Sequence, residues 1–228
     1  MKHRSNAAEW MDDLEMEGEQ LLSTLKTLAK INARLGGDAV SLKGVKKLIK
    51  SGTSKAGLHL IDLGCGEGSQ LRHLANYSRR HKLNWKFTGV DANAACIAFA
   101  QERSVDYPEI TYLKADVFEW NMPKCDIVLA TLFMHHFDDE QIMLIIEKAN
   151  AEVALGWVVN DLHRSSIAYG LFWALGLFIR NEMIMHDGLL SIKKGFKIEE
   201  LEHMSNSLKM QSTISWNWAY RYLWLLRK

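Results

Sequence analysis

The spacing of hydrophobic positions changes along the chain, from helical intervals near the start to short blocks further on. Within the first 52 residues, leucines and alanines recur every three or four positions, which predicts helices. Gly36-Gly37 predicts the end of the first helix, and Ser41 is the expected cap of a second helix that ends at Ser51-Gly52. We expect residues 1–52 to form a helical cover that is part of the same domain as residues 53–228.

After residue 52, strand-like blocks alternate with amphipathic helices. Strands are predicted over Leu58–Leu63, Trp85–Val90, Ile110–Ala115, Asp126–Thr131, Trp157–Asn160, Met210–Trp218 and Tyr220–Leu226. Helices are predicted over Ser69–Arg80, over Ala94–Glu102, from a cap at Asp138 to an inner-face Val153, near 167–179 and over Ile198–Ser205. This alternation predicts an α/β fold with a mostly parallel sheet, in which ligands bind outside the carboxyl ends of the strands.

The most apolar stretch follows the fifth predicted strand. Residues 167–179 read IAYGLFWALGLFI, too short for a membrane span, which needs about 20 residues. Its aromatic side chains are Tyr169, Phe172, Trp173 and Phe178. We expect a helical lid at about 165–196 that covers a flat ligand, or a helix that packs on the core or on a dimer partner. His186-Asp187-Gly188 is expected to form a turn just after the lid helix, lining the pocket.

Composition narrows the function without choosing it. The chain is 48% hydrophobic and 24% charged, with a net charge of +1, so no strong field attracts nucleic acid. Its three cysteines show no metal-ligand spacing and are typical of a reducing cytosol. No apolar signal-peptide core follows Met1. We expect a cytoplasmic protein with no transmembrane segment and no metal site.

A glycine-rich motif follows the first predicted strand and opens a helix. Residues 61–69 read IDLGCGEGS, which places Asp62, Gly64, Cys65 and Gly66 at a turn where backbone can approach a ligand closely. The spacing G-x-G-x-G differs from the dinucleotide fingerprint, whose third glycine would stand where Ser69 is. The lysine of a phosphate-binding P-loop is absent as well.

Two acidic residues follow the next two strands in order. Asp91 after Val90 is placed to accept hydrogen bonds from ribose hydroxyls, and Asp116 to accept from the amine of an adenine, with the Val117 amide beside the ring. Three signals at three successive strand ends predict one nucleoside-type site. The residues assigned to it are Asp62, Gly64, Cys65, Gly66, Asp91, Ala92, Asp116, Val117 and Thr131.

These motifs resemble those of the class I S-adenosylmethionine-dependent methyltransferases. IDLGCGEG resembles their first motif, GVDANAACIAFAQ the second, and LKADVFEW and CDIVLATLFMHHF the next two. The resemblance implies S-adenosylmethionine as cofactor and a Rossmann-like, seven-stranded sheet with helices on both faces and an antiparallel last strand. EWMDDLEMEGEQLLSTLKTLAKINARLGG, VVNDLHRSSIAYG and HDGLLSIKKGFKIEEL are similar to a bacterial subfamily found with polyketide and pigment genes, broadly like the quinone-biosynthesis methyltransferases.

The methyl acceptor is inferred by exclusion. The Asn/Asp-Pro-Pro-Tyr/Phe turn of nucleic-acid and amide methyltransferases is missing, because residues 130–136 read ATLFMHH. No acidic cluster of the catechol type is apparent. We therefore expect O-methylation of a small aromatic, phenolic or polyketide-derived acceptor. The alternatives are C-methylation of a quinone precursor, a non-catalytic S-adenosylmethionine binder and, disfavoured by Ser69, a nicotinamide-linked reductase.

Candidate catalytic side chains follow the fourth and fifth strands. His135 and His136 are bases that could take a phenolic proton, with His136 preferred and His135 as its support. Arg164 is a candidate to hold a carboxylate or phenolate, and Asp161 either caps or pairs with it. Placement of the methyl and the nucleophile in line can itself supply much of the rate, about 7–11 kcal/mol in favourable cases.

Overall fold

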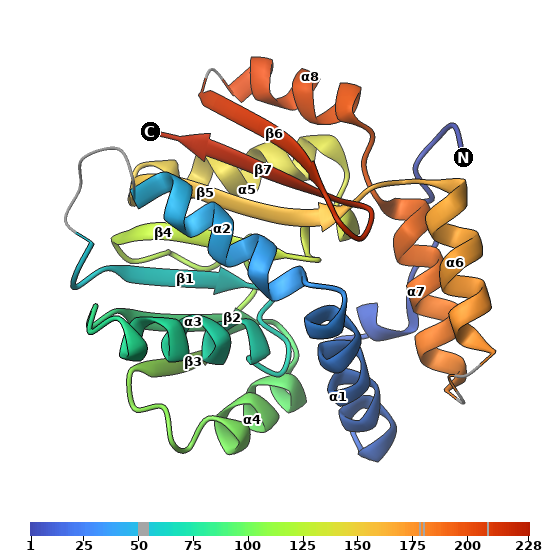
Figure 1. Cartoon of the computed structure of the whole chain (residues 1–228), viewed down its shortest axis with the longest axis horizontal. Coiled ribbons are helices and arrows are strands. Elements are labelled where there is room, and N and C mark those ends of the chain that lie inside the picture. The colour runs from blue at the N-terminus through green and yellow to red at the C-terminus, as the bar shows by residue number, and fades with distance from the viewer. Residues whose placement is uncertain (50–54, 178, 180, 209) are drawn as a thin grey trace.

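One sheet of seven strands organises the computed structural model, which describes residues 1–49, 55–177, 179, 181–208 and 210–228 (Figure 1). The strands are β1 (His59–Leu63), β2 (Lys86–Asp91), β3 (Ile110–Lys114), β4 (Cys125–Thr131), β5 (Val153–Leu162), β6 (Gln211–Asn217) and β7 (Arg221–Arg227). Their order is β3-β2-β1-β4-β5-β7-β6. Strands β1 to β5 pair in parallel, and β7 is antiparallel to β5 and β6. The mostly parallel, seven-stranded sheet predicted from the sequence is confirmed.

Helices cover both faces of this sheet, as predicted. They are α1 (Glu19–Arg34), α2 (Gly37–Ile49), α3 (Ser69–Arg80), α4 (Ala94–Arg103), α5 (Asp139–Asn150), α6 (Ser166–Gly176), α7 (Glu182–Lys194) and α8 (Ile198–Leu208). Helices α2 and α3 share one buried core with the sheet, and α5 and α8 share the core on its other face. Helices α6 and α7 stand beside the sheet (Figure 1). Among the described residues, no helix has both the length and the apolar character to cross a membrane.

A local sequence signal explains where helix α5 begins. Asp138 and Gln141 form the predicted capping box at the start of α5, each side chain accepting from the other residue's amide. Helix α5 ends at Asn150, so Val153 belongs to β5 and not to the helix as predicted, although it packs in the same core. Strand β5 is longer than expected because the short turn after α5 leaves Val153 free to pair with Cys125 of β4.

The N-terminal segment differs most from its prediction. Residues 1–18 are not helical apart from one short 3₁₀ turn, η1 (Trp10–Asp12), and they run along α7. Helix α1 ends at Arg34, as the glycine pair predicted, but α2 restarts at once at Gly37. Ser41 therefore caps nothing: it is buried inside α2, where its hydroxyl bonds Thr131 and accepts from Asn160. The helix stop predicted at Ser51-Gly52 lies outside the described residues.

The predicted turn at His186-Asp187-Gly188 is wrong, because these residues lie inside helix α7. A glycine within a helix costs only about 1 kcal/mol relative to alanine. At Gly188 packing requires it, since a Cβ there would stand 2.3 Å from the ring of Phe172 in α6. The close contact between α6 and α7 therefore explains the glycine that the sequence pattern associates with a turn.

Candidate functional site

A cavity of about 950 Å³ lies at the carboxyl ends of the central strands. Its size is at the upper end for small-molecule sites, which gives room for two ligands side by side. Every residue that the sequence assigned to the cofactor lines it: Asp62, Gly64, Cys65, Gly66, Asp91, Ala92, Asp116, Val117 and Thr131. Helices α1, α6 and α7 supply further walls, together with η1 and the segments after β4, after β5 and before β7. The structure therefore brings the three strand-end signals into one site.

The glycine loop has backbone geometry that other residues rarely adopt. Gly64 has φ +65°, and a Cβ at this position would lie 2.1 Å from the ring of Phe133. Gly66 has φ +52°, and a Cβ there would meet only Leu25 of α1, at 3.8 Å. On one side the loop packs closely against Phe133, which follows β4, and on the other side it is open towards α1. A ligand can therefore lie against its backbone.

One buried and one partly buried carboxyl group, those of Asp62 and Asp91, stand beside this loop. Asp62 is 2% exposed and its Oδ1 has no hydrogen-bond partner among the described residues. Burial, and then the charges of Asp91 and Asp38, raise the pKa of Asp62 well above its ordinary value. Asp91 accepts from the amides of Gly66, at 2.9 Å, and Asn93, at 3.0 Å. Burial raises the pKa of Asp91 as well, although these two amide bonds oppose the shift. A cation bound here would favour the ionised form of both groups.

Asp116 and Val117 form the wall beyond β3. The Asp116 carboxylate accepts from the Phe118 amide at 2.8 Å, which fixes the turn. Phe118 packs edge-on against Phe137 with ring centroids 5.4 Å apart. This part of the cavity therefore combines a flat apolar surface with one fixed carboxylate, a combination suited to a purine ring.

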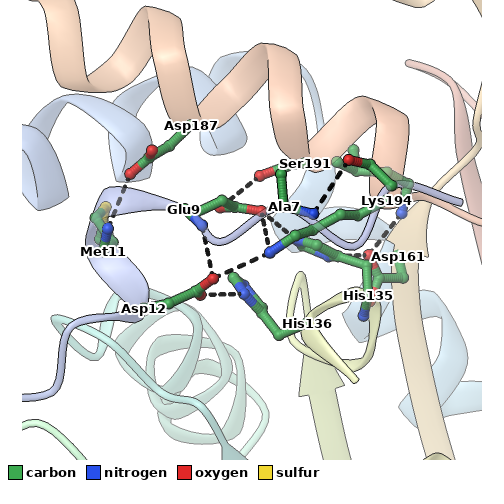
Figure 2. A network of polar contacts seen from close by, with 12 residues as sticks. Ala7, Glu9, Met11, Asp12, His135, His136, Asp161, Asp187, Ser191 and Lys194 are labelled. Carbon is green, nitrogen blue, oxygen red and sulfur yellow. Dashed lines mark hydrogen bonds and ion pairs between the residues drawn. The ribbon is translucent and has the colours of Figure 1, made fainter. Parts of the chain in front are cut away.

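The opposite end of the cavity is built around Glu9 and Asp12 of the N-terminal segment, for which the sequence predicted a helical cover but no site residue (Figure 2). The backbone amides of Trp10 and Met11 donate to the two oxygens of Asp187, at 2.8 and 3.0 Å. The Ser191 hydroxyl donates to Glu9 at 2.8 Å. Helix α7 thus holds η1 over the cavity, with Glu9 and Asp12 facing the two histidines.

His136 is oriented by Asp12 of this segment. His136 Nδ1 lies 2.7 Å from Asp12 Oδ1, and because a carboxylate only accepts, Nδ1 carries the proton and Nε2 is left free. Burial would lower the pKa of His136, but the hydrogen bond to Asp12 and the charges of Glu9 and Asp12 raise it above its ordinary value. For Asp12 burial raises the pKa, whereas the bond to His136 and the contact with Lys194 lower it well below its ordinary value.

His135 lies behind His136 and is not available in the same way. It is 3% exposed, and its Nδ1 bonds Asp161 at 2.7 Å. Burial raises the pKa of Asp161, but the charge and hydrogen bond of His135 outweigh it and lower that pKa. The two imidazole rings are 4.3 Å apart. Asp161 therefore pairs with His135 and not with Arg164, which corrects the sequence-based expectation.

Glu9, His135 and His136 also offer ligand atoms within 4.8 Å of one another, a spacing that a metal ion could use. Glu9 Oε1 is 3.8 Å from His135 Nε2 and 3.3 Å from Lys194 Nζ. Lys194 also lies 3.0 Å from Asp12 Oδ2. The ammonium group already supplies positive charge beside these carboxylates, so the geometry does not require a metal ion.

Arg164 does not lie in the site, contrary to the sequence-based hypothesis. Its side chain is 1% exposed and does not line the cavity. It pairs with Glu200 at 2.6 Å and donates to the carbonyls of Gly195 and Lys2. These contacts tie β5 to α8 and the N-terminus. His163, one residue earlier, does line the cavity and accepts from Trp216 Nε1 at 3.3 Å.

The predicted lid divides into inward and outward side chains. Leu171, Phe172 and Leu175 of α6 line the cavity. Trp173 is 56% exposed, and Tyr169 contacts Lys193 through its ring face, so neither faces the ligand space. Phe178 lies outside the described residues. Among the described residues of α6, one aromatic side chain, two leucines and Ala168 line the cavity, where the sequence suggested four aromatics in the lid.

Several residues of the cavity were missed from the sequence: Glu9, Asp12, Gln70 and Arg221. Asp187 and Gly188 line the cavity as expected, although they do so from helix α7 and not from a turn. The spacing of Glu9 and Asp12, which form the capping box of η1, was the one local signal for the N-terminal pair. Arg221 opens β7, so its place beside the end of β5 follows from strand order, which sequence spacing did not give.

Comparisons with known proteins agree with this architecture. Residues 60–154 match the model of a family described as a methyltransferase domain. That segment spans β1 to the first residues of β5 and includes all the predicted cofactor residues. No curated protein sequence matches the chain.

Several solved structures with a similar fold are methyltransferases. A plantazolicin methyltransferase in complex with S-adenosylhomocysteine has a TM-score of 0.69 at 15% identity, covering 90% of this chain and 89% of its own. A magnesium protoporphyrin IX methyltransferase from Synechocystis PCC 6803, also with S-adenosylhomocysteine, has a TM-score of 0.58 at 17% identity, and the match covers 86% of this chain and 84% of that one. A SAM-dependent methyltransferase from Aquifex aeolicus has a TM-score of 0.63 at 13% identity, and the match covers 92% of this chain and 99% of that one. These likenesses confirm the Rossmann-like methyltransferase fold.

Proposed function

We propose that this protein is an S-adenosylmethionine-dependent methyltransferase that methylates an oxygen of a small, apolar, phenolic acceptor. The observation that carries the proposal is the single cavity, which joins the nucleoside-type residues of three strand ends to the Asp12–His136 pair. A glycine loop and an oriented base that line the same cavity favour a site in which a cofactor and an acceptor meet. The methyltransferase-domain match over residues 60–154 supports the same activity.

The residues present fit the cofactor. The open side of Gly66 leaves backbone free for the ligand, Asp91 and Asp116 stand where ribose and adenine would be held, and Asp62 offers a buried carboxylate oxygen without a partner. When bound, S-adenosylmethionine supplies an electrophilic methyl group on a positively charged sulfur. The raised pKa values of Asp62 and Asp91 are consistent with a site meant to hold positive charge.

On the acceptor side, His136 takes the phenolic proton at Nε2. Asp12 holds the proton on Nδ1 and stabilises the imidazolium that forms, while His135, fixed by Asp161, supports the ring from behind. A base in this position contributes roughly 10²–10⁴-fold to the rate. Arg164 has no part in this step, because its contacts lie outside the cavity.

The walls around this base select an apolar acceptor and exclude water. Phe133, Phe137 and Phe172 line the same space as Leu171 and Ile192. Helices α1, α6 and α7 and the turn η1 all contribute residues to the lining of this cavity, which supports a cover formed by residues 1–52 and 165–196. Excluding water strengthens the electrostatic effect of the Asp12–His136 pair.

A labelled methyl-transfer screen over phenols, quinones and carboxylic acids tests this function. We expect product with phenols at neutral pH, and strongly reduced product with His136→Gln. His203→Gln, exposed on α8, is the matched control. If the product is methylated at a ring carbon of a quinone precursor, the enzyme is a C-methyltransferase and the proposed O-methylation is wrong. If the protein binds the cofactor but transfers methyl to no acceptor, it is a non-catalytic binder.

A further inference from the structure

Arg221 is a cavity residue that the reaction outlined above does not use. It is the first residue of β7 and pairs with Leu162 of β5 and Asn217 of β6. Its side chain is 4% exposed and lines the cavity. The strand pairing on both sides fixes its backbone, so the direction of the side chain into the cavity is fixed as well.

The guanidinium group of Arg221 has no partner among the described residues. Its Nε and Nη1 are buried without a hydrogen bond, and no carboxylate forms an ion pair with it there. Arg164 shows the usual arrangement, since it is equally buried but bonded to Glu200 and to the Gly195 carbonyl. A buried charge without a partner is strongly destabilising, so a ligand that supplies the partner is the simplest explanation.

The two acidic side chains whose charges affect the pKa of Arg221 are engaged elsewhere. Burial lowers the pKa of Arg221 to about 10, against the charges of Asp161 and Asp38, which raise it. Asp161 bonds His135, and Asp38 accepts from Asn32 at 2.7 Å. The negative charges of these carboxylates therefore favour the charged form of Arg221, while its Nε and Nη1 donors stay unbonded.

Asp62 is the complementary case in the same cavity. It too is buried in the cavity wall and has an oxygen without a partner. Asp62 and Arg221 line the same cavity, and the charge of Asp38 affects the pKa of both groups. An unpartnered carboxyl group, which a bound cation would favour in its ionised form, and an unpartnered guanidinium group in a shared cavity match a zwitterion. The guanidinium fork matches a carboxylate in two parallel bonds.

We propose that Arg221 binds the carboxylate of the cofactor's methionine end, with Asp62 receiving the ammonium group of the same end. This assignment rests on the proposed function. It makes Arg221, from outside the segment that matches the methyltransferase domain, a residue that determines how the cofactor is held.

Calorimetric titration with two thioethers tests the assignment without any turnover. S-adenosylhomocysteine carries the amino-acid end, and 5′-methylthioadenosine lacks it. Arg221→Met should weaken the binding of S-adenosylhomocysteine about tenfold or more, because charged hydrogen bonds are lost. The affinity for 5′-methylthioadenosine should stay within about twofold of wild type. Asp62→Asn should show the same selectivity. Arg227→Met, at the far end of β7, is the matched control and should change neither affinity.

Arg221→Lys keeps the charge without the fork and should lose less affinity than Arg221→Met, which covers the case in which the methionine variant does not fold. Equal weakening of both ligands, or of neither, would overturn the assignment. A carboxylate on the acceptor is the other source: if Arg221→Met spares S-adenosylhomocysteine but abolishes binding of benzoate to its complex, the cofactor assignment is overturned. Failure of wild-type protein to bind either thioether would instead refute the proposed function together with this inference.

Discussion

His136 Nδ1 lies 2.7 Å from Asp12 Oδ1, although the two residues are 124 positions apart in the chain. Asp12 belongs to η1, outside residues 60–154 that match the methyltransferase domain. The cofactor end of the cavity is built from strand ends inside that segment, whereas the polar end depends on the N-terminal segment and on α7 (Figure 2). The acceptor chemistry is therefore expected to depend on residues that the domain match does not cover.

The first prediction concerns His136 as the base. His136→Gln should leave the free energy of cofactor binding within about 0.5 kcal/mol of wild type, and turnover at neutral pH should fall by about 10²-fold or more. The defect should shrink as pH approaches the pKa of the acceptor, since solvent then supplies the ionised nucleophile. A stable variant with full activity at neutral pH would refute this role. The same change at His135 should instead lower stability, because that ring is buried against Asp161.

The second prediction concerns the pH dependence of the rate. Asp12 raises the pKa of His136, so Asp12→Asn should lower it and move the rising limb of kcat/KM towards lower pH. Maximal turnover should also fall, because an amide no longer fixes the proton on Nδ1. Asp13→Asn, at the exposed neighbouring position, is the control. A limb that stays in place in Asp12→Asn would show that this pair does not govern the rate.

The third prediction follows from the same pair and concerns stability. The raised pKa of His136 contributes stability that is complete below the unfolded value of about 6.5 and is lost as pH rises through the folded value. The lowered pKa of Asp12 contributes stability above the unfolded value of about 3.9 and loses it in acid. The difference in Tm between wild type and Asp12→Asn should be largest between about pH 4 and 6.5 and narrow above. A constant difference up to pH 9 would contradict the linkage.

The fourth prediction separates the two parts of the N-terminal cover. Removing residues 1–12 deletes Glu9 and Asp12 and should abolish turnover while binding of S-adenosylhomocysteine stays within about 0.5 kcal/mol. Removing residues 1–35 also deletes Leu21 and Leu25, which pack against α4. It should weaken the cofactor as well, with the sheet still folded by circular dichroism. Normal cofactor binding in the longer deletion would show that α1 is no part of the cofactor site.

The fifth prediction concerns metal ions. Because Lys194 lies beside Glu9 and Asp12, treatment with a chelator should leave turnover unchanged, and added Zn²⁺ should inhibit by taking the histidine nitrogens. Metal analysis of the purified protein provides the independent check. If the protein contains stoichiometric metal, and if activity is lost on chelation and restored by the ion, then these residues form a metal centre and His136 is not a free base.

The sequence predicted those parts of the molecule whose signals are local. Helix α3 has the predicted bounds, and the α5 capping box forms as expected. The glycine loop, Asp91 and Asp116 could be assigned together because parallel strands end at one edge of the sheet, so their order along the chain implies proximity in space.

The parts that were missed depend on contacts between distant residues. Trp10 and Asp187 are 177 positions apart, and no periodic pattern marks η1 as part of a site. Arg164 and Arg221 both stand near strand ends, yet the first is tied to Glu200 and the second faces the cavity. That difference comes from the side of the sheet on which each side chain packs, which strand spacing alone does not reveal.

The central claim is that the cavity is built for S-adenosylmethionine, and calorimetric titration of the wild-type protein tests it most directly. S-adenosylhomocysteine should bind with a micromolar-range Kd, and Asp91→Ala should weaken it by at least about 1.5 kcal/mol, since the charged acceptor of the ribose hydroxyls is lost. NAD should give no measurable heat, because Ser69 stands where a dinucleotide site needs glycine. Binding of NAD with no response to S-adenosylhomocysteine would contradict the account.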